Sequence, residues 1–160
     1  MSIPAQLLAE AIKKGIMITC AESCTGGLLA AALTDLPGSS AMFDRGFVTY
    51  TNAAKIDLLG VSAATLRDHG AVSEETAQEM AQGALSRSDA QIAVSITGIA
   101  GPGGSDHKPE GRVCFGLATA SKQHSETHDF GALGRAQVRI KARDHALALL
   151  AQAVAQAPSN

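Results

Sequence analysis

The chain has 160 residues, a formal net charge of −2 and 46% hydrophobic residues, the size and composition of one soluble domain over residues 1–160. Lysine and arginine form no basic cluster, which excludes a nucleic-acid surface, and no stretch approaches the roughly 20 apolar residues of a membrane-spanning helix. No signal peptide is recognisable and the three cysteines are an odd number, so we expect reduced thiols in a cytoplasmic protein without a membrane partner.

Short apolar runs alternate with segments of helical periodicity along the first half of the chain. In order, this half predicts a helix through Leu7–Ile12 that stops at Gly15, a strand at Ile16–Cys20, a turn at Ala21–Thr25, a helix at Gly26–Leu33 and a strand at Phe43–Thr51.

The second half continues the alternation. It predicts a short helix capped by Asn52, further helices at Ser62–His69, Ser73–Ser86 and Gly134–Gln156, and strands at Gln91–Ile96, Arg112–Ala118 and Gln123–Phe130. Helices that alternate with short apolar strands indicate an α/β fold. We therefore expect a three-layer α/β/α sandwich with a mixed, mostly parallel central sheet.

Three segments that could carry chemistry lie at the ends of predicted strands, where open α/β sheets bind their ligands. The first is Ala21–Gly27, which reads AESCTGG and leads from a strand into a helix. Ser23 and Cys24 are both candidate nucleophiles, and free N–H groups at a helix start favour an anion or a developing oxyanion. The alternative is that Ser23 or Thr25 only caps the helix.

The second segment is Thr49–Lys55. If Asn52 is the N-cap, Lys55 falls in the first helical turn, where a cation is disfavoured by roughly 0.3–1 kcal/mol. That field lowers the lysine pKa by less than about one unit, so burial would have to supply the rest. A neutral lysine can act as general base for a serine. The alternative is an ordinary exposed lysine.

The third segment is the glycine-rich loop Ser95–Ser105, which could form a nest of N–H donors for a phosphate. It matches neither the Walker pattern nor the dinucleotide fingerprint, and its alternative is a surface loop. Arg135 and Arg139 share one face of the last helix and could clamp a phosphate, although such pairs also occur on solvated faces.

The sequence favours neither a metal site nor a cofactor. His124 and His128 lie in a predicted strand, where a spacing of four gives no compact chelate. The other histidines are isolated: His69, His107 and His145.

With these segments in hand, the sequence resembles the C-terminal domain family of the competence-damage-inducible protein CinA, which includes stand-alone nicotinamide-nucleotide amidases of the PncC type. The resemblance runs from about Leu7 to Leu150. Its landmarks are Ala21–Gly27, Tyr50 with Asn52 and Lys55, Leu58–Val61, Gly70–Ser73, Thr97–Gly104, Lys108–Gly111, and Arg135 with Arg139.

The resemblance implies a metal-independent hydrolysis of nicotinamide mononucleotide to nicotinic acid mononucleotide and ammonia, without a cofactor. It implies Ser23 as nucleophile, Lys55 as base and Tyr50 as an assisting hydroxyl, with the Gly26 end of the first segment at the oxyanion. The substrate-binding residues expected are Thr25, Gly26, Asn52, Thr97, Gly98, Gly101, Gly103 and Gly104, and we add Arg135 and Arg139 for the phosphate. The expected partner is a small nucleotide, and we expect a homo-oligomer, with a dimer as the simplest case.

Two other functions stay open. A non-catalytic nucleotide-binding module would keep the fold and the glycine loop, but the presence of Ser23, Tyr50 and Lys55 together favours an enzyme. A cysteine hydrolase based on Cys24 would be sensitive to thiol alkylation and would stay active in a Ser23→Ala variant.

Overall fold

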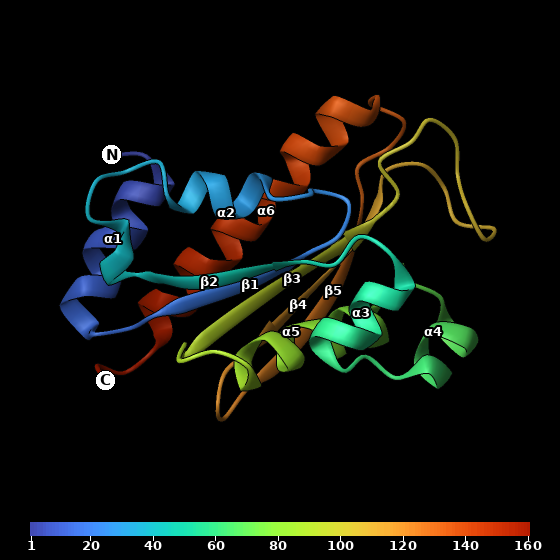
Figure 1. Cartoon of the computed structure of the whole chain (residues 1–160). Coiled ribbons are helices and arrows are strands. Elements are labelled where there is room, and N and C mark those ends of the chain that lie inside the picture. Colours follow the sequence, from blue (N-terminus) through green and yellow to red (C-terminus); the bar gives the residue numbers. More distant parts are fainter.

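The computed structural model describes residues 1–160 and contains one five-stranded sheet between two layers of helices (Figure 1). The elements are α1 (Ile3–Lys14), β1 (Ile18–Glu22), α2 (Leu28–Leu33), a short 3-10 helix η1 (Ser39–Ala41), β2 (Phe43–Val48), α3 (Asn52–Leu59), α4 (Ala63–His69), α5 (Glu74–Ser86), β3 (Ile92–Gly98), β4 (Arg112–Ala118), β5 (Gln123–Asp129) and α6 (Arg135–Gln156). No helix is both long and apolar enough to cross a bilayer.

The strands follow the order β2-β1-β3-β4-β5. β1 pairs in parallel with β2 and β3, whereas β4 pairs antiparallel with β3 and β5, so the sheet is mixed as predicted. Helices α1, α2 and α6 cover one face and α3, α4 and α5 cover the other, which confirms the three-layer sandwich (Figure 1). Because β1, β2 and β3 run in parallel, the three chemical segments that follow them leave the sheet at the same edge.

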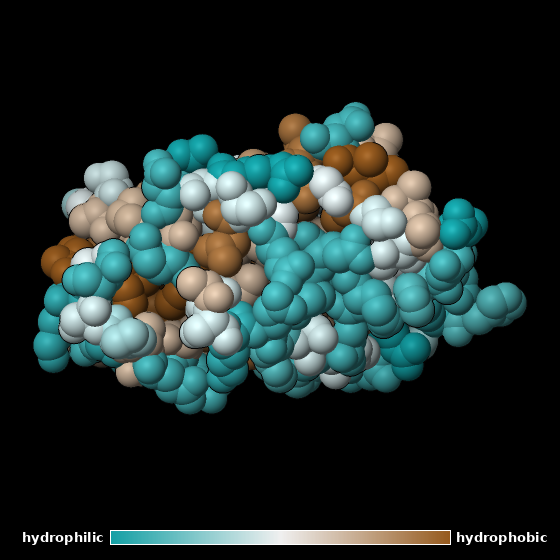
Figure 2. Space-filling model, turned by 90° about the horizontal axis from the view of Figure 1, so that it is seen from below, coloured by the Kyte–Doolittle hydropathy of each residue, from teal (hydrophilic) through white to brown (hydrophobic).

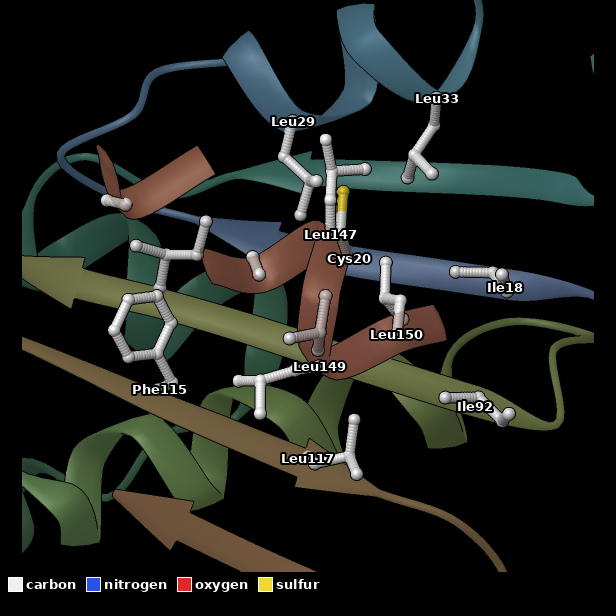
Figure 3. Close-up of a cluster of buried hydrophobic side chains, with 14 of the residues drawn as sticks. Ile18, Cys20, Leu29, Leu33, Ile92, Phe115, Leu117, Leu147, Leu149 and Leu150 are labelled. Carbon is white, nitrogen blue, oxygen red and sulfur yellow. The ribbon is translucent and has the colours of Figure 1, made fainter. Parts of the chain in front are cut away.

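The central strands β1 and β3 are buried on both faces, which explains their nearly continuous apolar sequences. The larger core lies between the sheet and the α1–α2–α6 layer, where side chains of β1, β3 and β4 meet those of α2 and α6 (Figure 3). A smaller cluster, which includes Leu59, Leu66 and Met80, lies under the other layer.

Helix α3 approaches α5 very closely at Gly83. A Cβ at this position would overlap the carbonyl oxygen of Leu59, so only glycine allows this packing.

On the side seen in Figure 2, the surface is mostly hydrophilic and its hydrophobic areas form separate patches.

Several predicted boundaries were wrong, among them the end of β2, which lies at Val48 and not at Thr51. β1 spans Ile18–Glu22 instead of Ile16–Cys20, because the parallel ladder with β3 begins at Ile18. α2 begins at Leu28 and not at Gly26, because both Gly26 and Gly27 have positive φ and cannot start a right-handed helix.

The predicted cap of α3 was also wrong. Thr51, not Asn52, is the N-cap, since Thr51 Oγ1 accepts a hydrogen bond from Ala54 N at 3.1 Å. Asn52 is the first helical residue and is exposed.

A fully buried carboxylate fixes the turn between β1 and α2. Glu22 accepts hydrogen bonds from the backbone N–H groups of Gly27 (3.2 Å), Leu29 (3.0 Å) and Ala30 (3.0 Å). These N–H groups belong to the first turn of a helix, where no intrahelical acceptor exists. The side chain of Glu22 therefore holds the loop that follows it.

We predict that Glu22→Gln lowers the free energy of unfolding by about 1.5–3 kcal/mol, because an amide nitrogen cannot accept from the N–H groups that it would face. Urea denaturation followed by circular dichroism measures this change. Asp57→Asn, an exposed carboxylate on α3, is the matched control and should stay within about 0.5 kcal/mol of the wild type. Equal stability of the two variants would contradict this role for Glu22.

Candidate active site

The three segments meet around one cavity at the shared edge of β1, β2 and β3. Its volume is about 340 Å³, the size of a small-ligand site. The first segment contributes Ser23 and Cys24, the second Tyr50 and Lys55, and the glycine-rich loop most of the opposite wall. Segments that are far apart in sequence therefore share one site, as their positions after parallel strands predict.

Lys55 and Ser23 form the pair at the base of this cavity. Lys55 is only 1% exposed, and its Nζ lies 3.0 Å from Ser23 Oγ, 2.9 Å from Thr49 O and 3.2 Å from Tyr50 O. The two carbonyl oxygens can only accept, so a neutral amine donates its two protons to them. The remaining lone pair then faces the Ser23 hydroxyl, which is the arrangement of a base and its nucleophile.

Burial sets the protonation of Lys55. Desolvation lowers its pKa from the ordinary 10.5 to about 8, and the interaction with Cys24 works weakly in the other direction. No carboxylate forms an ion pair with Lys55. Roughly a tenth of the lysine is therefore neutral at pH 7. The sequence predicted a lowered pKa, and burial is its main cause.

Cys24 lines the cavity but is a poor nucleophile. Burial raises the pKa of its thiol to about 11, and the backbone N–H of Cys24 and then the nearby charge of Arg139 offset only part of that effect. A thiol with this pKa is almost entirely protonated near neutral pH. The geometry therefore favours Ser23 over Cys24.

The loop that carries Ser23 leaves two backbone donors free. The N–H of Gly26 donates to Ser23 O at 3.0 Å, and that of Gly27 donates to Glu22, so neither is available to a ligand. The N–H groups of Cys24 and Thr25 donate to no other residue, and that of Cys24 faces its own thiol. The N–H of Gly26, which the sequence placed at the oxyanion, is thus already bonded within the loop, whereas the N–H groups of Cys24 and Thr25, which follow Ser23, are not bonded to another residue.

Arg135 crosses the mouth of the cavity. Its guanidinium donates to Gly101 O and to the Tyr50 hydroxyl, both at 2.7 Å. The phenol of Tyr50 therefore points to Arg135, and only its carbonyl oxygen contacts Lys55. Arg135, Lys55 and Lys108 line the cavity with one acid, Asp106, and this balance favours an anionic ligand.

The predicted binding residues divide into two groups. Those that line the cavity are Thr97, Gly98, Gly101, Gly103, Gly104 and Arg135. Those that do not are Thr25, Gly26, Asn52 and Arg139. Arg139 instead donates to Cys24 O at 3.0 Å and to Thr25 O at 3.1 Å, so it supports the nucleophile loop from α6.

A family model described as the CinA C-terminal domain matches residues 1–154. The chain belongs to this family. Among solved structures, the competence/damage inducible protein CihA of Agrobacterium tumefaciens is 46% identical, with a TM-score of 0.88 over 98% of both chains. The competence damage-inducible protein A of Klebsiella pneumoniae is 40% identical, with a TM-score of 0.92 over 96% of both chains.

Two kinds of curated relatives match this CinA domain. The nicotinamide-nucleotide amidohydrolase PncC of Escherichia coli K12 is 50% identical over 147 residues, which cover 91% of this chain and 89% of that protein. The PncC of Enterobacter agglomerans is 64% identical over 106 residues, which cover 66% and 65%. The CinA-like protein of Chloroherpeton thalassium is 58% identical over 122 residues, but the match spans only 29% of its length.

Glu110 and Lys108 hold the glycine-rich loop and the segment beside it. Neither residue was assigned a role from the sequence. Glu110 accepts a hydrogen bond from Gly103 N at 2.6 Å and lies so close to Gly101 that a Cβ there would collide with it. Lys108 donates to His69 O (2.8 Å) and Val72 O (2.5 Å). Two signals in the sequence pointed to them, their place after the glycines and the Lys108–Gly111 landmark of the family resemblance.

The lowered pKa of Lys55 predicts a pH-dependent stability. The folded state loses its proton near pH 8 and the unfolded state near pH 10.5, so between these values the unfolded chain binds more protons. The stability of the wild type should therefore rise across this window relative to Lys55→Met, by about 3 kcal/mol in total. Below pH 8 the difference between the two proteins should be constant.

Urea denaturation of both proteins from pH 7 to 10.5 measures this difference. The other groups that titrate at high pH are the same in both proteins, so their contribution to the stability cancels in the difference. A difference that stays flat from pH 8 to 10.5 would show that Lys55 has an ordinary pKa.

Proposed function

We propose that this CinA domain hydrolyses the carboxamide of nicotinamide mononucleotide to give nicotinic acid mononucleotide and ammonia. The observation that carries the proposal is the buried Lys55 amine 3.0 Å from Ser23 Oγ, at the base of a cavity with excess positive charge. The names of the PncC relatives, nicotinamide-nucleotide amidohydrolases, support the same substrate.

In the first half of the reaction, Lys55 Nζ takes the proton of the Ser23 hydroxyl while Oγ attacks the carboxamide carbon. The negative charge that develops on the carbonyl oxygen is stabilised by the N–H of Cys24, which donates to no other residue of the protein. The carbon–nitrogen bond then breaks, Lys55 returns the proton to the leaving nitrogen, and ammonia departs from a seryl ester.

In the second half, water attacks the ester carbon and Lys55 accepts its proton. The ester bond breaks, the proton passes to Ser23 Oγ, and the carboxylate product leaves. Base, nucleophile and oxyanion donor are all groups of the protein, so no step in this scheme requires a metal ion.

The substrate phosphate fits the other end of the cavity. Arg135 reaches the glycine-rich loop, and the N–H groups of Gly101 and Gly104 have no acceptor within the protein. Oriented backbone N–H groups beside a guanidinium form an anion site. Binding of the phosphate there would hold the carboxamide against Ser23.

We predict that Ser23→Ala and Lys55→Met each lower kcat by at least about 10³-fold, because each removes one half of the reacting pair. Ammonia release from nicotinamide mononucleotide, assayed with a chelator present, measures the loss. Cys24→Ala is the matched control and should retain activity within about tenfold.

Two outcomes would contradict the proposed function and indicate another one. Activity that survives Ser23→Ala but not Cys24→Ala would indicate a cysteine hydrolase. Tight binding of the mononucleotide without ammonia release from the wild type would indicate a binding module.

Arg135→Ala should lower kcat/KM for the mononucleotide by about 10–100-fold, which corresponds to the loss of a charged hydrogen bond of roughly 1.5–3 kcal/mol. The riboside lacks the phosphate, so its kcat/KM should change little. Lys141→Ala, an exposed cation on the same helix, is the control. An equal loss for both substrates would place the phosphate elsewhere.

A further inference from the structure

Three of the chain's five histidines converge on one carboxylate outside the catalytic cavity. Glu126 lies on β5 between His124 and His128, and residues two apart on a strand point to the same face of the sheet. That face is covered by α6, which contributes His145. None of these four residues lines the cavity that holds Ser23 and Lys55.

The contacts of Glu126 are all with imidazole nitrogens. His145 Nε2 lies 2.9 Å from Glu126 Oε2, and His128 Nε2 contacts the same oxygen. His124 Nε2 lies 2.8 Å from the other oxygen, Oε1. No lysine or arginine pairs with this carboxylate.

Burial by itself disfavours the charged form of Glu126, but hydrogen bonds from the three histidines outweigh it and hold its pKa at about 2. The carboxylate is therefore anionic at neutral pH.

The geometry is close to that of a metal site. One ligand atom from each of Glu126, His128 and His145 lies within 4.8 Å of the others, and the two imidazole rings have centroids 4.0 Å apart. A tetrahedral zinc ion with bonds of about 2.0–2.1 Å separates its ligand atoms by about 3.3 Å.

Aromatic rings and a small cavity surround the histidine cluster. Phe115 packs against His145 with ring centroids 4.6 Å apart, and Phe130 stacks on His128 at 5.9 Å, so aromatic rings fix both imidazoles. His124 and Glu126 also border a cavity of about 140 Å³, which gives solvent access to the cluster. Lys122 lines the same cavity, so an ion would enter past one positive charge.

We propose that Glu126, His128 and His145 bind one divalent transition-metal ion of the zinc class. Two imidazoles and one carboxylate are a known three-ligand set for Zn²⁺, and a water molecule from the adjacent cavity would take the fourth position. On binding, each ligating histidine presents the lone pair of Nε2 and carries its proton on Nδ1. His124 stays on Oε1 as the outer partner that orients the carboxylate.

The bound ion would join the edge strand β5 to α6. Binding to the folded state alone raises the apparent stability, so added Zn²⁺ should raise the melting temperature. The metal would act at this cluster and not in amide hydrolysis, which uses separate residues.

The test is a titration of the full chain, without any histidine tag and after treatment with a chelator, with ZnCl₂ in a calorimeter. We expect one ion per chain. His145→Gln and Glu126→Gln should each weaken binding by at least about 100-fold, and His124→Gln by about 10–100-fold, the range for an outer partner. His69→Gln, an exposed histidine on α4, is the matched control and should bind as the wild type does.

Co²⁺ provides a readout on the unaltered protein, since a tetrahedral site gives intense visible absorption bands that competing Zn²⁺ removes. Circular dichroism establishes that each variant is folded. The proposal is overturned if the wild type binds no stoichiometric metal, or if folded His145→Gln and Glu126→Gln bind as tightly as the wild type. Ammonia release in the presence of chelator is a separate measurement, so failure of one proposal leaves the other standing.

Discussion

The buried carboxylate of Glu22 is the interaction on which the site depends. Glu22 is the last residue of β1, and its side chain reaches forward to the first N–H groups of α2. The residues in between must therefore form a tight loop, and Ser23 lies at its start. Arg139 fixes the same loop from α6 through the carbonyls of Cys24 and Thr25, so two layers of the fold determine where Ser23 lies.

The parallel half of the sheet brings Lys55 next to Ser23. β2 runs beside β1 in the same direction, so the segment after β2 emerges next to the Ser23 loop. Thr51 starts α3 at that point, and its first turns carry Lys55 back toward the sheet, where the side chain is buried. An amine that is buried without a carboxylate is costly to charge, and this cost lowers the pKa of Lys55 to about 8.

Local patterns in the sequence were enough to predict the helical layers, the approximate positions of the strands, and the meeting of Ser23, Lys55 and the glycine-rich loop at one site. They failed where the outcome depends on backbone angles or on distant contacts. The two positive φ values at Gly26 and Gly27 shifted the helix start and removed Gly26 as a donor. The histidine cluster needs the register of α6 against β5, which no spacing in the sequence reveals.

The close contact at Gly83 shows that the position of Lys55 depends on residues outside the cavity. Lys55 is carried by α3, and the distance of α3 from the sheet is set where the carbonyl of Leu59 touches α5 at Gly83. The packing of α3 on α5 thus fixes where Lys55 lies. A substitution at Gly83 would move Lys55 relative to Ser23 and change its burial, so the pKa of this lysine depends on a residue that lies outside the cavity.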